Sequence, residues 1–332
     1  MDKKGFEVQF NWIFAVIAGA AIIALAAFLV VKNRGITDSS FDVQTLKTVD
    51  AIVTGTGISS DVTKVSDISS KLAVGCNRIA IGSAQRNYQN IVLFAPDSII
   101  EGKLITLTLP INLPFKVSNM LYVTSPKIRY ILVGKNEIIS MINKSLPDSM
   151  QTEMASSVMA ASAIKNTNNY KVRFIVADKD AFAAFSVPKS LEKMPNFDVS
   201  AVVVSGSTDN GEATFYQKKG LVWEPKGSSN YLTLQGLLGA VFAESRENYD
   251  CSLKSLESRA KIMMEIYSQR TKKLALLAKD SECKPLYAEA EARISSILGK
   301  SIITNPEAFT SFANDWKNKN SDLEVLSCPS LY

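Results

Sequence analysis

The sequence has 332 residues, 46% of them hydrophobic, and its 37 basic and 32 acidic residues give a net charge of +5. The two signs are interspersed without a long basic tract, so the charge gives no support to nucleic-acid binding. The sequence contains no histidine, which excludes Ser-His-Asp and Cys-His catalysis in their usual forms and histidine-ligated metals. It also lowers the expectation of an enzyme, because histidine is the commonest general base.

An apolar run from Trp12 to Val31 predicts a transmembrane helix, since no charged residue lies between Glu7 and Lys32. A helix of about 20 residues spans roughly 30 Å, the thickness of a bilayer core. A cleaved signal peptide would have a shorter run and a small-residue cleavage site, whereas this run leads directly into Lys32 and Arg34. We therefore expect an N-terminal tail at 1–11, a retained anchor in the lipid bilayer at 12–31 and a linker at 32–45.

Residues 46–126 are predicted to form a β-rich segment of short strands punctuated by prolines. Residues 49–54 are a β-branched run, and residues 104–109 alternate apolar side chains with Thr, which is typical of a half-buried strand. Further strands are expected at 78–82 and 90–94.

Residues 127–245 are predicted to form an α/β layered domain, because strand and helix patterns alternate there. The run 201–204 is apolar on both faces, which favours a central strand covered by helices. The expected strands lie at 128–134, 170–177, 199–205, 213–217 and 221–224, and the expected helices lie at 136–145, 150–164 and 179–192.

Residues 246–332 are predicted to be helical. An apolar stripe from Leu253 to Leu277 indicates one long helix, and two further helices are expected from Pro285 to Gly299 and from Asn305 onward. The predicted fold class is thus an N-terminal transmembrane helix, a mixed α/β domain made of a β-rich layer and a layered α/β sheet, and a C-terminal helical hairpin or bundle.

The four cysteines are Cys76, Cys251, Cys283 and Cys328, and no C-x-x-C spacing occurs. Their even number permits two disulfides, of which we expect at least one; four buried thiols are the alternative. A continuous helix of about 26 residues would separate Cys251 from Cys283 by roughly 39 Å, whereas disulfide-linked Cα atoms lie within about 7 Å. We therefore expect Cys328 to pair with one end of the long helix and Cys76 with the other.

The prediction of membrane orientation depends mainly on these cysteines. Basic residues flank the apolar run on both sides, so the positive-inside rule hardly distinguishes the two orientations. Disulfides form in oxidising compartments. We therefore expect a single-pass cell-membrane protein whose C-terminal domain is extracytoplasmic.

Two segments at predicted strand ends are candidates for a ligand or cofactor site. Ser205, Ser207 and Asp209 follow the most apolar strand, and ligands of open α/β sheets bind beyond such ends. A hairpin turn is the favoured alternative there. Asp178, followed by Asp180, could bind Mg²⁺ or act as an acid or base, but capping of the next helix is favoured. No catalytic residue, metal ligand or cofactor is assigned.

Two resemblances add to these predictions. Lys3-Lys4-Gly5-Phe6-Glu7 before an apolar helix resembles a prepilin processing site, with Glu7 at the second rather than the fifth position after the cleaved glycine. The segments at 10–14, 121–126 and 248–251 resemble uncharacterised single-pass membrane proteins of small-genome archaea. The second resemblance implies an anchor and an architecture, and it carries over no catalytic residue.

These observations favour a membrane-anchored envelope protein that acts as a non-enzymatic binding or assembly module. Other envelope proteins are the expected partners, and an oligomer remains open. One alternative is a ligand-binding or enzymatic domain on a degenerate doubly wound sheet; another is a pilin-like filament subunit.

Overall fold

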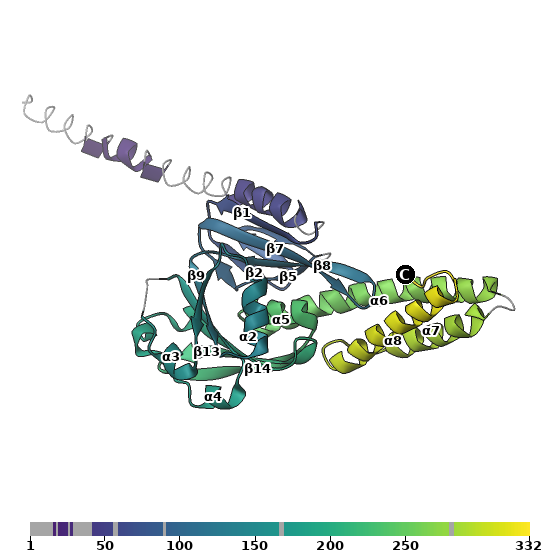
Figure 1. The fold of residues 1–332 in the computed structure, drawn as a ribbon. Coiled ribbons are helices and arrows are strands. Elements are labelled where there is room, and N and C mark those ends of the chain that lie inside the picture. Colours follow the sequence, from purple (N-terminus) through teal and green to yellow (C-terminus); the bar gives the residue numbers. More distant parts are fainter. Residues whose placement is uncertain are drawn as a thin grey trace, which may run out of the picture.

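The computed structural model describes residues 16–17, 19–25, 27–28, 42–55, 59–88, 91–165, 169–278 and 282–332. Over these residues the chain is a mixed α/β protein with three sheets, followed by C-terminal helices, as the sequence predicts. Figure 1 shows the sheets gathered in one body, with the long helix α6 running out of it and α7 and α8 packed along its distal part.

Two four-stranded sheets and one helix form the β layer. One sheet has the order β1-β7-β8-β5 and the other the order β4-β3-β2-β6. All neighbours are antiparallel except β5 and β8, which are parallel. The strands are β1 Val62–Ile68, β2 Leu72–Gly75, β3 Arg78–Ile81, β4 Ala84–Asn87, β5 Val92–Phe94, β6 Ser98–Ile99, β7 Gly102–Asn112 and β8 Lys116–Thr124.

A six-stranded sheet of order β10-β9-β11-β12-β13-β14 forms the second layer. Its first four strands are parallel, and β13 and β14 add an antiparallel hairpin to β12. Apolar residues at 201–204 lie buried in β12, as expected for a strand covered on both faces. The strands are β9 Ile128–Val133, β10 Gln151–Ala155, β11 Lys171–Val176, β12 Val199–Gly206, β13 Asn210–Lys219 and β14 Val222–Leu232.

The helices connect the two layers and form the C-terminal arm. One buried apolar cluster joins the β layer, the six-stranded sheet and the C-terminal helices, because Phe94, Tyr122, Val202, Tyr249 and Trp316 belong to it. The helices are α2 Glu137–Ser145, α3 Val158–Ser162, α4 Lys179–Ala183, α5 Thr233–Phe242, α6 Arg246–Leu277, α7 Cys283–Ile297 and α8 Pro306–Val325, with 3₁₀ turns η1 Lys189–Leu191 and η2 Asn196–Asp198.

The tip of the β7–β8 hairpin fixes the arm to the β layer. The ring of Phe115 lies 4.2 Å, centroid to centroid, from that of Tyr267 in α6 and 5.8 Å from that of Trp316 in α8. Tyr332, near the C-terminal end of the sequence, stacks on Trp316 at 6.4 Å. Such aromatic contacts add to the energy of apolar burial.

The strand predicted at 49–54 is wrong, because residues 42–55 are helical. Leu46, Val49 and Val53 recur at steps of three and four, and all three are buried in the core of the β layer. This helical periodicity outweighs the preference of β-branched residues for strands, which depends strongly on context.

The helices predicted at 150–164 and 179–192 are also wrong in extent. The first segment contains the edge strand β10 and the short helix α3, which starts at the N-cap Ser157. The second contains α4 and then η1, which begins after Pro188. A proline ring is not tolerated in a helix interior, so it separates the two. Helix α5 was not predicted; most of it is buried, so it lacks a polar face.

The long C-terminal helix is confirmed and is continuous over 32 residues, although it begins at Arg246, before Cys251. Cys251 is bonded to Cys76 and Cys283 to Cys328, with Cα separations of 5.6 and 5.9 Å. Cys251 and Cys283 are therefore not partners, as the length of the helix requires.

The predicted anchor at 12–31 lies partly outside the described residues. Its described parts, 16–17, 19–25 and 27–28, are helical. Within the portion of the chain that the structure describes, no helix is both long and apolar enough to cross a membrane.

Candidate functional site

One flank of α6 and the adjoining β layer line a cavity of about 500 Å³, here called the α6 groove. Most of its lining comes from successive turns of α6, while Asn77 comes from the β2–β3 turn and Val117 from β8. The lining residues are Asn77, Val117, Cys251, Lys254, Ser255, Ser258, Arg259, Ile262 and Met263.

The sequence of α6 explains why this flank faces the groove. Leu253, Leu256 and Ala260 are buried in the main core and hold the helix in place. Residues one or two positions away on the helix turn, such as Lys254 and Ser258, then point aside from that core. The apolar stripe that predicts the helix thus also determines which residues line the groove.

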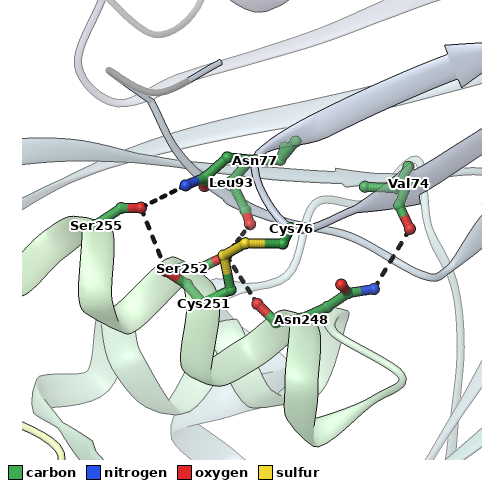
Figure 2. The surroundings of a disulfide bond; sticks show 8 residues. All are labelled: Val74, Cys76, Asn77, Leu93, Asn248, Cys251, Ser252 and Ser255. Carbon is green, nitrogen blue, oxygen red and sulfur yellow. Dashed lines mark hydrogen bonds between the residues drawn. A yellow bond between two sulfur atoms is a disulfide. The ribbon is translucent and has the colours of Figure 1, made fainter. Parts of the chain in front are cut away.

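Cys251, one of the groove-lining residues, is disulfide-linked to Cys76 of the β2–β3 turn (Figure 2). Beside the disulfide, Asn77 Nδ2 donates to Ser255 Oγ at 2.7 Å, and Asn248 Nδ2 donates to the Val74 carbonyl at 3.3 Å. Asn77 has a φ of +50°, a conformation that asparagine tolerates better than most residues. The β2–β3 turn is therefore fastened to α6 on both sides of the disulfide.

The groove has a positive electrostatic character. Lys254 is exposed, and Arg259 Nη1 donates to Ser118 Oγ at 3.4 Å. Burial lowers the pKa of the Arg259 guanidinium, but an arginine stays charged at neutral pH. Among the described residues that line the groove, none carries a carboxylate. Together with Val117, Ile262 and Met263, the groove offers aliphatic surface next to two cations.

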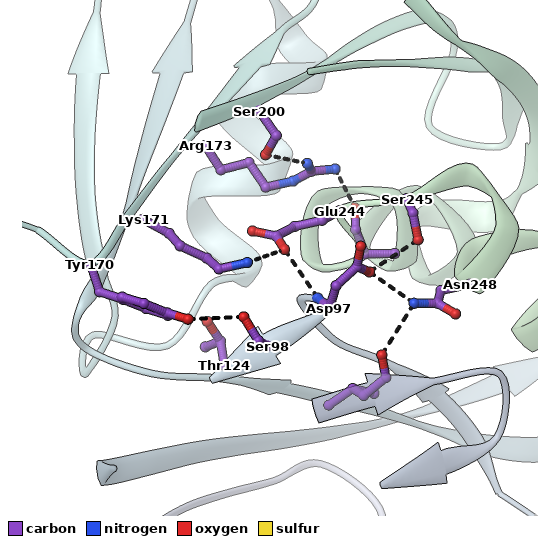
Figure 3. A network of polar contacts seen from close by, with 12 residues as sticks. Asp97, Ser98, Thr124, Tyr170, Lys171, Arg173, Ser200, Glu244, Ser245 and Asn248 are labelled. Carbon is purple, nitrogen blue, oxygen red and sulfur yellow. Dashed lines mark hydrogen bonds and ion pairs between the residues drawn. The ribbon is translucent and has the colours of Figure 1, made fainter. Parts of the chain in front are cut away.

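A second cluster of polar residues lies where the α/β sheet meets the β layer (Figure 3). Lys171 and Glu244 form an ion pair in which both side chains are almost fully buried. Glu244 Oε2 also accepts from the Asp97 backbone N–H at 3.0 Å. Asp97 Oδ1 in turn accepts from Ser245 Oγ at 3.0 Å and Asn248 Nδ2 at 2.8 Å.

Arg173 completes this cluster from the same strand as Lys171. Its guanidinium donates to the carbonyls of Val241, Ala240 and Ala243 and to Ser200 Oγ. It therefore satisfies carbonyl groups at the C-terminal end of α5, which lack partners within the helix. Burial lowers the pKa of Arg173, and it raises the pKa of Glu244 against the opposing charge of Lys171.

A cavity of about 210 Å³ adjoins this cluster, lined in part by Lys171, Ser200 and Glu244. Lys171 and Ser200 stand at the start of β11 and β12, so the cavity lies at the edge opposite to the carboxyl ends where ligands of α/β sheets bind. The charged groups here bond to one another and to backbone. The cluster thus connects the six-stranded sheet to the β layer, and we call it the joint between the layers.

The residues predicted at the carboxyl ends of the strands have structural roles. Asp178 caps α4, accepting from the Ala181 N–H at 2.8 Å, which is the favoured interpretation of the sequence. Ser205, Ser207 and Asp209 lie at the β12–β13 turn, where Ser207 Oγ accepts from the Asp209 N–H at 3.2 Å.

Tyr231 holds this turn closed. Its hydroxyl bonds to the carbonyl oxygens of Ser205 and Ser207 at 3.0 and 2.7 Å. On the neighbouring strand ends, Asn136 Nδ2 donates to the Ala177 carbonyl at 2.8 Å and ties the start of α2 to the end of β11. The contacts of residues 205–211 are therefore those of a hairpin turn, the alternative that the sequence favours.

The sequence did not lead us to predict either the α6 groove or the polar cluster around Lys171, Arg173 and Glu244. The charged Lys171 and Arg173 interrupt an otherwise apolar strand, a signal that could have marked buried polar partners. The sequence signal for the α6 groove is weaker, because Lys254, Arg259 and Ile262 lie beside the apolar stripe and resemble ordinary surface residues of a helix.

Comparisons with known proteins give no further identification: no family model, curated protein or solved structure matches this chain.

Proposed function

We propose that this chain is a membrane-anchored envelope protein that binds another protein through the α6 groove and performs no chemistry itself. The observation that carries the proposal is the groove: a cavity of about 500 Å³ with aliphatic and cationic lining, adjoined by the Cys76–Cys251 disulfide. A rigid surface of mixed character suits recognition, since binding to it costs little conformational entropy.

Anchoring is supported by the apolar run 12–31 and by the exposure of its described helical residues. Side chains such as Ile22, Ile23 and Phe28 are more than 60% exposed. Exposed large apolar side chains gathered on one helix support contact with an apolar surrounding, such as a lipid bilayer.

An extracytoplasmic position for the folded part is supported by the cysteines. Both pairs have Cα separations that suit a disulfide, 5.6 and 5.9 Å, and they join segments 175 and 45 residues apart. Disulfides of this structural kind persist in oxidising compartments.

The proposal is tested by site-specific photo-crosslinking in intact cells. A benzophenone amino acid replaces Ile262 at the groove in the full chain, and in a matched control it replaces Met159 on α3, which is 81% exposed. Irradiation is expected to give a discrete higher-mass adduct from position 262 and none from position 159. The Ser258→Trp variant, which fills the groove, should abolish the adduct. Equal adducts from both positions, or no adduct from position 262, would reject groove binding.

A further inference from the structure

The α6 groove continues along the helix into an exposed aliphatic pair. Ser255, Arg259, Ile262 and Ile266 follow one another at steps of four, three and four, so they share one face of α6. Ile262 is 59% exposed and Ile266 is 55% exposed. Large aliphatic side chains in adjacent turns of a soluble helix indicate a surface that another molecule covers.

The charges along this face are predominantly positive. Lys254 and Arg259 line the groove, and Lys273 is exposed two turns beyond Ile266. Glu265 flanks the aliphatic pair and is the acidic residue nearest to it in sequence. A partner segment that places carboxylates against Lys254 and Arg259 would match these cations, and charge complementarity of this kind determines partner choice.

A second copy of this chain fits the face poorly. In a two-fold pair, residue i of one copy meets residue j of the other and the reverse. With α6 parallel to its copy, Arg259 would meet Arg259. With α6 antiparallel and Ile262 of one copy set against Ile266 of the other, Arg259 would meet Gln269 and Lys254 would meet Leu274. The parallel arrangement brings like charges together, which costs binding energy, and the antiparallel arrangement places no carboxylate against either groove cation.

We propose that the α6 groove and the adjoining Ile262–Ile266 face bind an acidic segment with aliphatic side chains, supplied by a different protein. This inference rests on the proposed function and adds the chemical class of the partner. From Lys254 to Ile266 the face covers 13 residues of helix, and its ends lie roughly 18 Å apart. A partner helix of about 14 residues is long enough to cover it.

The test uses three synthetic 14-residue peptides as probes. Each has the same leucine positions on one helix face, and the polar face carries Glu, Gln or Lys. Their binding to the full chain in nanodiscs of uncharged phospholipid is measured by fluorescence anisotropy, with empty discs as the blank. Because an exposed ion pair contributes modestly, two pairs should give the Glu peptide about fivefold to tenfold tighter binding than the Gln peptide. The advantage should shrink as salt screens the charges.

Matched variants assign the preference to the groove. The Lys254→Gln/Arg259→Gln variant should bind the Glu and Gln peptides about equally, whereas Lys193→Gln, at an exposed lysine outside the groove, should keep the preference. Lys254→Gln alone is a second variant that leaves the Arg259–Ser118 contact intact, and it should lose part of the preference.

The outcomes separate the two proposals. Equal binding of the Glu and Gln peptides, or a preference that survives in the double variant, overturns the acidic partner while leaving groove binding in place. A crosslink from position 262 to a second copy of the chain also overturns it. Failure of all three peptides together with absence of any crosslink from position 262 rejects the proposed function itself.

Discussion

Cys76 and Cys251 lie 175 residues apart in the sequence, yet their Cα atoms are 5.6 Å apart. The bond fastens the turn between β2 and β3 to the second turn of α6, and Cys251 lines the α6 groove. A covalent link between the β layer and the helical arm therefore adjoins the groove.

Removal of this link should destabilise the folded part. The Cys76→Ser/Cys251→Ser variant is expected to lose about 2–5 kcal/mol of unfolding free energy, because the cross-link restricts a long loop in the unfolded chain. Chemical denaturation of both proteins, in buffer without reductant or added oxidant, measures the difference in unfolding free energy. Reductant should bring the parent protein down to a stability no greater than that of the variant. An unchanged midpoint in the variant would mean that the bond does not form in solution.

Val203 tests the central position of β12. The side chain is 2% exposed and packs in a cluster with Val176 and Phe174 of the neighbouring strand. Val203→Asp should cost more than about 3 kcal/mol, since it places an unpartnered carboxyl group in a covered sheet. Val222→Asp, at a strand position that is 61% exposed, is the matched control and should cost about 1 kcal/mol or less. Equal melting of the two variants would contradict the sheet order.

The buried pair of Lys171 and Glu244 predicts an asymmetry between single and double variants. Glu244→Ala leaves the ammonium of Lys171 buried without its partner and should cost about 3–5 kcal/mol. Lys171→Met/Glu244→Leu removes both charges and should be more stable than Glu244→Ala. Thermal unfolding of the three proteins checks the order; a double variant less stable than the single one would mean that the pair itself stabilises the joint.

The anchor is tested by charge insertion. Ala21→Arg/Leu25→Arg should release the full chain from membranes, because each arginine at the centre of a spanning helix costs about 2.5–3.5 kcal/mol on insertion scales. Alkaline extraction followed by immunoblotting measures the membrane fraction. The control is Lys32→Gln, outside the apolar run, which should stay in the membrane. Resistance of the double arginine variant to extraction would contradict a spanning helix.

The sequence predicts those elements whose periodicity is long or unmistakable. The stripe from Leu253 to Leu277 predicts α6, and the apolar run at 201–204 predicts β12, because both patterns are set by burial in the core. Residues 49–54, predicted as a strand, belong instead to the helix over 42–55, since the β preference of these residues and their helical periodicity point to different structures. Residue preference alone was not enough here, because the tertiary packing of Leu46, Val49 and Val53 decides the structure.

The α6 groove could not be predicted, for a different physical reason. Its two walls come from the β2–β3 turn and from α6, brought together by tertiary packing and by a pairing of cysteines that the sequence left open. The helix length excluded Cys251–Cys283, but either remaining arrangement satisfied it. The sequence did indicate polar residues at the carboxyl ends of the strands. In the structure, Asp178 caps α4 and Ser207 bonds within the β12–β13 turn.

The state of the four cysteines in intact cells tests the extracytoplasmic position of the folded part most directly. Cells that produce the full chain are treated with a membrane-impermeant maleimide reagent that adds mass, with and without an impermeant phosphine reductant. If Cys76–Cys251 and Cys283–Cys328 are oxidised and lie on the outer side of the membrane, the reagent should add no mass without reductant. After reduction, all four cysteines should be labelled, which gives a shift of four additions. Labelling that requires permeabilised cells but no reductant would place reduced thiols inside the cell and contradict both the proposed location and the disulfides.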